Sequence, residues 1–296
     1  MPNLKSIKRK ISSIKNTRQI TKAMKMVAGS KLKRNQSAMN EFRTYASTYD
    51  SVIKNISDNT VLYSHPFYGK ILKKREGGNG SNTGIIIIST DRGLCGSFNM
   101  NLFKLFFEEL KVREINSSQV KLYILGKKGS DFFKKHNYEV VFNKSFSESE
   151  SAINLSVLLS DSISNDFKEN KIENIYIMSN QYISTLHQKA YAEKVLPFET
   201  QAAGKNKKSG GYLIEPVDYE EEIIDKIFKD YIQTKIYFKI LESFAGEQAS
   251  RMNAMDNATR NAGKLINKLT VSYNKARQAA VTLEILDIIN GVNAIK

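Results

Sequence analysis

The sequence predicts a protein of α/β plus coiled-coil class. Long N- and C-terminal helices are expected to form an antiparallel coiled coil, with a central Rossmann-like α/β domain inserted between them. Three observations predict this fold. Small and apolar residues recur at helical spacing near the C-terminus, a similar pattern fills the N-terminal region, and strand-like and helix-like segments alternate between the two.

The C-terminal helix is predicted most clearly over Leu241–Val292, which contains no proline. A repeat of 3.5 residues is typical of a helix packed along another helix. At ~1.5 Å per residue this segment would span about 75 Å, so it needs a partner of similar length. The residues in register are Leu241, Ala245, Gln248, Met252, Met255, Thr259, Ala262, Ile266, Leu269, Tyr273, Ala276, Ala280 and Leu283.

Residues 3–57 are predicted to be that partner helix. Its periodic positions are Leu4, Ile7, Ile11, Ile14, Thr21, Met24 and Ala28. Residues 1–40 are rich in Lys and Arg and contain no Asp or Glu, a composition that can also mark a mitochondrial transit peptide. The helical pattern continues to residue 57 without a cleavage point, so we interpret the segment as part of the coiled coil.

The expected domain limits follow from changes in composition. Residues 1–60 form the N-terminal coiled-coil helix, and 61–83 form a glycine-rich linker. Residues 84–215 form the α/β domain with an antiparallel extension, and 216–296 form the C-terminal coiled-coil helix, which Glu220–Glu222 are expected to open.

Within the α/β domain, strands and helices alternate in the way that predicts a small parallel sheet. The expected strands are Ile85–Thr90, Val120–Leu125 and Ile175–Ser179, and the expected helices are Met100–Lys111, Ser130–His136 and Ala152–Phe167. The antiparallel extension comprises Lys189–Phe198, a glycine- and lysine-rich loop at 204–211, and Tyr212–Ile214.

The overall composition limits the classes of function. The 296 residues carry a net charge of +15, which favours an acidic partner: nucleic acid, an anionic membrane surface or an acidic protein. The single cysteine excludes an internal disulfide and argues against a cysteine-based metal site. No apolar run approaches the ~20 residues that cross a bilayer, and no secretory signal is evident.

No catalytic, cofactor or metal site is predicted. The 204–211 loop lacks the spacing of a phosphate-binding loop, and Gly126–Ser130 lacks the third glycine of a dinucleotide fingerprint. Cys95 could be a nucleophile, but no histidine lies near it in the sequence. The acidic runs are interpreted as solvated helix faces.

The densest polar cluster follows the first strand, at the edge where open α/β sheets bind ligands. We interpret it as a docking loop that contacts a partner through its backbone. The loop consists of Asp91, Arg92, Gly93, Leu94, Cys95 and Gly96.

Four polar residues lie on or beside the C-terminal seam: Arg251, Gln278, Thr282 and Glu284. Gln278 and Thr282 are four residues apart, and therefore share one helical face. Beside a basic N-terminal helix, they suggest a shaft whose polar groups meet surrounding protein.

These segments together resemble the gamma subunits of F-type ATP synthases, of the bacterial type. The resemblance spans essentially the whole chain, although Gly29, Ser97 and the 204–211 loop depart from the usual pattern. The matching residues are Ile11–Ala28, Asp91–Gly96 with Asn99, Arg251–Met255, Ala258-Thr259, Leu269-Thr270, Tyr273–Ala279, Thr282, Glu284-Ile285 and Ile288-Ile289. The chain starts where bacterial members start, which argues against an organellar precursor.

The resemblance implies a non-catalytic rotor stalk that couples proton-driven rotation of a membrane c-ring to ATP synthesis and hydrolysis. Implied partners are three alpha and three beta subunits, the epsilon and delta subunits and the c-ring. The implied location is peripheral, at the cytoplasmic face of the bacterial inner membrane. Matching the family's coupling positions gives rotor–stator contacts at Met24, Arg251, Gln278, Thr282 and Glu284.

Two other classes of function are weighed against the rotor. A basic coiled-coil protein could bind nucleic acid, with an affinity that falls steeply as salt rises, but no groove-reading motif adjoins the heptads. An α/β enzyme with helical arms would need a nucleophile–base pair, and none is apparent. We therefore expect no nucleic-acid partner and no cofactor.

Overall fold

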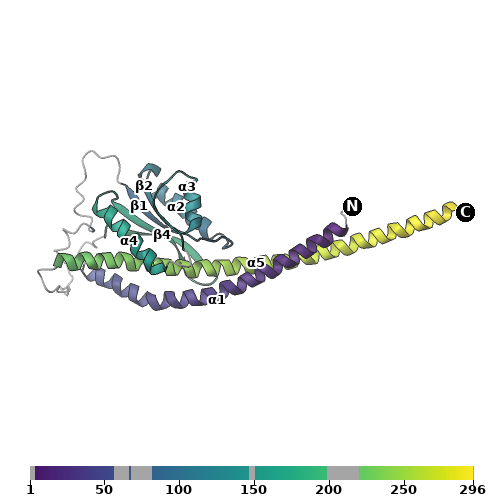
Figure 1. Ribbon diagram of the computed structural model, residues 1–296, viewed down its shortest axis with the longest axis horizontal. Coiled ribbons are helices and arrows are strands. Elements are labelled where there is room, and N and C mark those ends of the chain that lie inside the picture. Colours follow the sequence, from purple (N-terminus) through teal and green to yellow (C-terminus); the bar gives the residue numbers. More distant parts are fainter. Residues whose placement is uncertain (1–3, 57–66, 68–81, 147–150, 199–219, 296) are drawn as a thin grey trace. The chain divides into compact units, whose positions relative to one another are not determined.

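A computed structural model describes residues 4–56, 67, 82–146, 151–198 and 220–295 (Figure 1). The elements, in chain order, are α1 (Leu4–Ile56), β1 (Thr83–Ile88), α2 (Phe98–Val112), a short 3-10 helix η2 (Ser117–Gln119), β2 (Val120–Leu125), α3 (Lys127–Lys134), β3 (Glu139–Lys144), α4 (Ala152–Lys168), β4 (Asn174–Tyr182), β5 (Gln188–Leu196) and α5 (Glu220–Ile295). Two long terminal helices enclose one sheet in the sequence, as predicted.

The five strands form one mixed sheet in the order β3-β2-β1-β4-β5. Strands β1 to β4 pair in parallel, and β5 pairs antiparallel with β4. The three predicted parallel strands are confirmed, and so is the antiparallel strand near residues 189–198. The 204–211 loop, Tyr212–Ile214 and most of the predicted linker lie outside the described residues.

Strand β3 is the element that the sequence analysis missed. It lies at an edge of the sheet, and its side chains are half-buried or exposed in alternation. The pairing with β2 shifts by one residue between Leu122 and Tyr123, which leaves Val141 without a partner in the register. A short, irregular and half-exposed edge strand lacks the continuous apolar run that identified β1.

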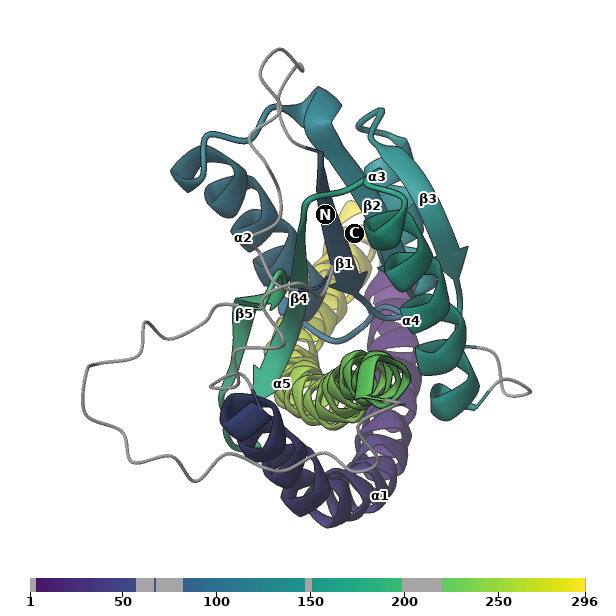
Figure 2. The ribbon, with the colours of Figure 1, turned by 90° about the vertical axis from the view of Figure 1, so that its left-hand side faces the viewer.

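The side chains of β1 alternate between two apolar layers. Ile85 and Ile87 pack with residues of α2 and α3, whereas Ile86 and Ile88 pack with residues of α4 and α5. Figure 2 shows α2 and α4 on opposite faces of the sheet. Because both faces are covered, every residue of β1 is buried.

The N-terminal part of α5 forms a wall of the second layer. Its buried residues recur every four positions, which places them on one face of the helix. They are Ile224, Phe228, Ile232, Ile236 and Ile240. The ring of Phe228 meets Phe67 edge-on and lies 5.0 Å from the centroid of Phe198. Two ion pairs join α5 to α4 at the rim: Lys229–Asp161 at 2.8 Å and Lys168–Asp225 at 2.7 Å.

The chain divides into two compact units, Ser30–Ser250 and Met1–Gly29 with Arg251–Lys296. In each unit, α1 pairs antiparallel with α5. In the first unit, Asn35 Nδ2 donates to the Phe244 carbonyl at 3.3 Å, and the Tyr231 hydroxyl donates to Asp50 at 2.7 Å. In the second unit, Thr21 lies opposite Thr259. The predicted antiparallel helix pair is therefore confirmed.

The predicted seam of α5 is confirmed over most of its length. Each position from Leu241 to Ala280 in the predicted register is buried or half-buried. Leu283 is the exception, because its residue is 45 % exposed. On α1, all seven predicted periodic positions are buried or half-buried. The seam thus ends before the helix does.

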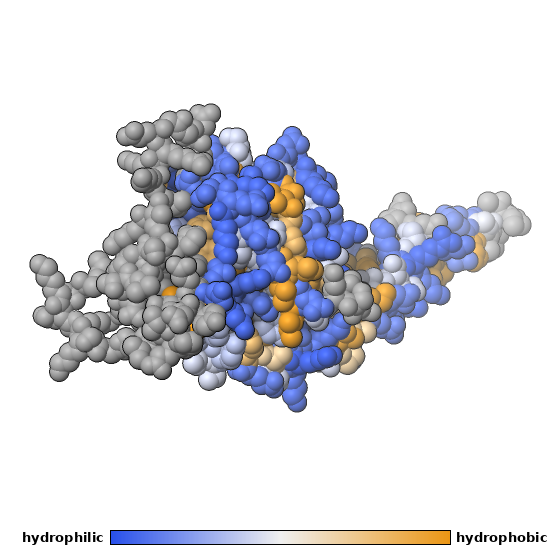
Figure 3. All heavy atoms as spheres, turned by 60° about the vertical axis from the view of Figure 1, so that its left-hand side comes forward, coloured by the Kyte–Doolittle hydropathy of each residue, from blue (hydrophilic) through white to orange (hydrophobic). Residues whose placement is uncertain are grey.

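The surface seen in Figure 3 is largely polar, with apolar atoms gathered in a narrow stripe. Exposed apolar residues of the unit Ser30–Ser250 include Val112, Val141, Ile153, Leu158 and Leu186. Exposed apolar residues are ordinary on the surface of a folded domain. Within the described ranges, no helix combines the length and apolar character needed to span a bilayer.

The burial of Phe228 yields a stability prediction. We expect Phe228→Ala to lower the free energy of unfolding by about 3–5 kcal/mol, because it leaves a cavity where sheet, α4 and α5 meet. Urea unfolding of the full chain measures the change. Leu186→Ala is the control: Leu186 is 84 % exposed, so its loss should change stability by no more than about 0.5 kcal/mol. Equal effects of the two substitutions would contradict this assignment of the core.

Candidate functional site

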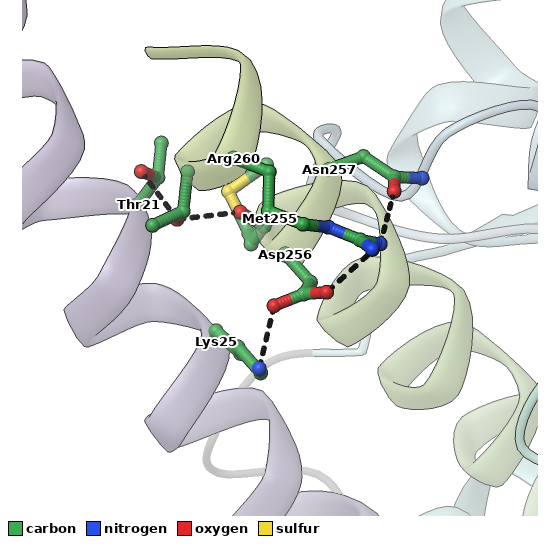
Figure 4. A network of polar contacts seen from close by, with 7 residues as sticks. Thr21, Lys25, Met255, Asp256, Asn257 and Arg260 are labelled. Atoms are coloured by element: carbon green, nitrogen blue, oxygen red, sulfur yellow. Dashed lines mark hydrogen bonds and ion pairs between the residues drawn. The ribbon is translucent and has the colours of Figure 1, made fainter. Parts of the chain in front are cut away.

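The coiled coil around Met24 contains a group of polar contacts between the two helices (Figure 4). Lys25 Nζ of α1 lies 2.5 Å from Asp256 Oδ1 of α5, and Arg260 Nη2 lies 3.0 Å from the other carboxylate oxygen. The hydrogen bond from Lys25 lowers the pKa of Asp256, and Arg260 adds to that effect. The carboxylate is thus held ionised between a cation from each helix.

A layer of threonines lies one turn away, inside the seam. The Thr259 hydroxyl is 2.8 Å from the Thr21 hydroxyl and 2.7 Å from the Met255 carbonyl. Thr21 is buried and also donates to the Arg18 carbonyl at 3.1 Å. A polar layer within an otherwise apolar coiled-coil seam favours one register, because a shift would separate the two hydroxyls and set each against apolar side chains.

Met24 is half-buried between these two layers. Around it, α1 exposes apolar as well as basic side chains: Ile20, Met26 and Val27 are each more than half exposed. Lys15 and Lys22 are also exposed. This part of α1 therefore offers both apolar surface and positive charge to another protein.

The C-terminal end of α5 differs from the rest of the helix, since residues 281–291 are all exposed. Many of them are apolar, and they cover most of the circumference of the helix, whereas Glu284 and Asp287 lie on the remaining side. The large apolar ones are Val281, Leu283, Ile285, Leu286, Ile288 and Ile289, each between 45 % and 62 % exposed. An exposed helix with so wide an apolar surface normally packs against other protein or a membrane.

The predicted contact residues are distributed along the helix pair rather than gathered in one site. Gln278, Thr282 and Glu284 are exposed, and the Thr282 hydroxyl donates to the Gln278 carbonyl at 2.9 Å. Arg251 is buried at the other end of this part of α5. About 27 helical residues separate it from Gln278, a distance of about 40 Å along the axis.

The predicted docking loop is held firmly within the Ser30–Ser250 unit. Asn99 fixes it from inside: its side chain accepts from the Thr90 amide at 3.2 Å and donates to the Thr90 hydroxyl at 2.7 Å. The carboxylate of Asp91 accepts from the Lys127 amide at 2.8 Å. Leu94 has a φ of 63°, a left-handed conformation, and its side chain is 62 % exposed.

Helix α5 occupies the inner side of this loop. The Ser250 hydroxyl donates to the Cys95 carbonyl at 2.7 Å. A Cβ at Gly246 would lie 3.1 Å from the Phe98 ring, so the glycine permits the close approach. The sheet order reverses between β1 and β4, where doubly wound sheets bind their ligands. Here that end of the sheet packs against the chain's own helix.

The chemistry of the loop does not suggest a catalytic cysteine. Cys95 is buried, and the side-chain amide of Asn99 donates to its Sγ at 3.6 Å. In the part of the chain that the structure describes, no three His, Cys, Asp or Glu side chains are grouped so as to hold a metal ion. Of the predicted loop residues, Arg92, Leu94 and Gly96 face outward.

Sequence reasoning missed the contacts that join α5 to its neighbours. Asp256 pairs with Lys25 of α1, and Ser250 donates to the carbonyl of Cys95. A heptad pattern does not identify such contacts between elements. A further set comprises Glu193 on β5 with Lys235, Lys239 and Glu242 on α5. Only the spacing of the three α5 residues, which places them on one helical face, could have suggested a shared partner.

Comparisons with known proteins agree along the whole chain. The family profile described as ATP synthase matches residues 3–295. The ATP synthase gamma chain of Histophilus somni (strain 129Pt) is 39 % identical over 298 residues, covering all of both chains. The ATP synthase gamma chain of Pasteurella multocida is 36 % identical, again covering all of both.

Solved structures share the fold. A chain of the Euglena gracilis mitochondrial ATP synthase, from its OSCP/F1/c-ring part, aligns with a TM-score of 0.67 and 19 % identity, covering 99 % of this chain and 94 % of that one. A chain of the central stalk and c-ring of the Tetrahymena thermophila enzyme aligns with a TM-score of 0.59 and 24 % identity, covering 81 % and 99 %.

The ion pair between the helices generates a charge-swap prediction. We expect Lys25→Glu to lower the thermal unfolding midpoint, because it sets two carboxylates against each other. Adding Asp256→Lys should recover part of the loss, since the pair across the helices is restored with its charges exchanged while the new lysine repels Arg260. Circular dichroism of the full chain measures both. Lys22→Glu, an exposed position one turn away, is the control; a double variant no better than the single one would count against the pairing.

Proposed function

Since the chain belongs to the ATP synthase family, among its gamma chains, we propose that it is the central rotor stalk of an F-type ATP synthase. One structural observation carries the proposal beyond family membership. The last turns of α5 expose apolar side chains around most of the helix, with Glu284 and Asp287 on the remaining side, and a helix does this at stability cost unless other protein surrounds it. A sleeve of alpha and beta subunits would supply that surrounding.

The proposed mechanism is a population shift driven by rotation. A shaft with different side chains on each side contacts one conformation of a catalytic beta subunit better than another, so each rotor angle favours a different conformation. Rotation by the membrane ring then moves each beta subunit through states of different nucleotide affinity, and ATP hydrolysis drives the reverse.

Five residues are proposed as the rotor–stator contacts: Met24, Arg251, Gln278, Thr282 and Glu284. The exposure of the last three supports a role in contacting other subunits. For Arg251, which is buried, the role would be exerted through its neighbours in the helix pair. The outward-facing part of the loop Asp91–Gly96 is proposed to dock a partner at the α/β domain.

The proposed partners are three alpha and three beta subunits, the epsilon and delta subunits and the membrane c-ring. The chain itself would be non-catalytic and would bind no cofactor or nucleic acid. It would lie at the cytoplasmic face of the bacterial inner membrane and associate peripherally through the complex. Residues 1–40, which are basic and contain no Asp or Glu, support contact with acidic surfaces of the surrounding subunits.

Purification of the complex tests the proposed function. The chain, tagged and gently extracted from its source membranes, should co-elute with Mg-ATPase activity and with two larger subunits in threefold excess. Stoichiometry is measured by quantitative mass spectrometry of the eluate. Elution as a single chain, or with nucleic acid and no ATPase activity, would overturn the proposal.

Gln278 and Thr282 provide the residue-level prediction. We expect Gln278→Ala with Thr282→Ala to lower the ATPase rate of the complex by about fivefold or more. A coupling contact must bind one conformation of a beta subunit better than another, and the two substitutions would remove that difference. Asn267→Ala with Thr270→Ala is the matched control, since the Thr270 hydroxyl also donates to the carbonyl four residues earlier, at 2.9 Å. Wild-type rates and assembly in the Gln278/Thr282 variant would remove both residues from the contact set.

A further inference from the structure

A group of largely buried charged side chains lies where strand β5 meets α5; the side chains of Glu193 and Lys235 are 26 % and 15 % exposed. Glu193 of β5 pairs with two lysines of α5: its Oε1 is 2.6 Å from Lys235 Nζ, and its Oε2 forms a longer ion pair, at 3.6 Å, with Lys239 Nζ. Lys239 also pairs with Glu242 at 3.2 Å. These four residues are called here the buried charge network. The side chains of Lys239 and Glu242 are 10 % and 5 % exposed.

The network continues through Tyr231 to the other long helix. Lys235 Nζ donates to the Tyr231 hydroxyl at 3.0 Å, and that hydroxyl donates to Asp50 of α1 at 2.7 Å. Burial raises the pKa of Tyr231 to about 12, although Lys235 opposes the shift. The phenol therefore stays protonated at neutral pH and can donate. A continuous polar path thus links β5, α5 and α1.

The lysine remains charged although it is buried. Burial alone would lower the pKa of Lys235, but Tyr231 and Glu193 outweigh burial and raise the pKa above its ordinary value. Lys239 lies close to aromatic faces, with its Nζ 5.6 Å from the centroid of the Tyr191 ring. Each cation is therefore matched by a carboxylate, an aromatic face or both.

Stability alone does not account for such a network. A buried ion pair is often no more stabilising than apolar residues of the same size, because both charges lose their hydration. The rest of this interface is apolar, and α5 buries Ile232, Ile236 and Ile240 there. Apolar burial is non-directional, whereas paired charges fix both the rotation and the height of a helix.

We propose that Glu193, with Lys235 and Lys239, is a torque joint: it locks the α/β domain to the shaft helix in a single orientation. This inference rests on the proposed rotor function and names the residues through which rotation passes from domain to shaft. Glu193 is the positioning residue, because one carboxylate holds both lysines. The path through Tyr231 to Asp50 extends the same lock to α1, so that both helices of the shaft turn with the domain.

The test uses the whole ATP synthase in inverted membrane vesicles, with ATP hydrolysis and ATP-driven proton uptake measured in the same preparation. In Glu193→Gln, Lys239 keeps Glu242 and Lys235 keeps Tyr231, so the chain should still fold and assemble. We expect proton uptake per ATP hydrolysed to fall by at least about twofold while hydrolysis continues. Glu193→Asp keeps the charge and should recover part of the loss.

Asp161→Asn is the matched control. It removes a carboxylate that also pairs with a lysine of α5, but both side chains of that pair are more than 40 % exposed. The uptake ratio should therefore match wild type.

Glu193→Leu with Lys235→Met separates orientation from stability. An apolar pair in place of the ions should preserve thermal stability and yet reduce the uptake ratio as Glu193→Gln does. A wild-type ratio in this variant, or in Glu193→Gln, would overturn the torque joint. Failure of the rotor function itself would be recognised differently, as absence of the unmodified chain from an ATPase complex.

Discussion

The constraint on which the structure depends is that one helix cannot bury its own side chains. Helix α5 runs for 76 residues, far longer than the helices of an ordinary globular domain. Along its length it must find different partners for its apolar face. Between Ile224 and Ile240 its apolar face is buried by the sheet and α4. Between Met255 and Ile266 its apolar face lies in the seam with α1. Beyond Ala280 no described element covers it.

This change in environment along one helix connects the fold with the proposed function. Where α5 meets the α/β domain, large aliphatic and aromatic side chains give a tight core. In the coiled coil, the seam is lined largely by small alanine and threonine side chains, which let the two helices approach closely. At the exposed end, a wide apolar surface of the helix is left for other protein to cover.

Polar contacts have a distinct role from the apolar ones. The apolar layers on both faces of the sheet provide most of the burial, but such contacts have no preferred direction. The Thr21–Thr259 layer, the Lys25–Asp256 pair and the buried charge network each set a register or an orientation. The Ser250–Cys95 contact does the same for the loop that follows β1, so that the ligand-binding end of the sheet is used for holding α5.

The sequence by itself determined which segments are helices or strands wherever periodicity was strong. The seam from Leu241 to Ala280, the seven periodic positions of α1 and the isoleucine strand β1 follow from spacing and hydrophobicity alone. Strand β3 was missed because an edge strand buries only part of its side chains. The contact residues of the shaft were predicted from polar positions on the seam together with the resemblance to the family, and they stay a prediction.

Only the tertiary structure decided which charged residues meet. Asp50, Glu193 and Lys235 are far apart in the chain, yet one polar path joins them. Likewise, Leu283 fits the heptad pattern but is exposed. Periodicity shows which face of a helix is apolar, but it does not show whether a partner covers that face. Which charged residues pair depends on how folding brings distant segments of the chain together. Local sequence indicates only the turns and the periodicity of each element.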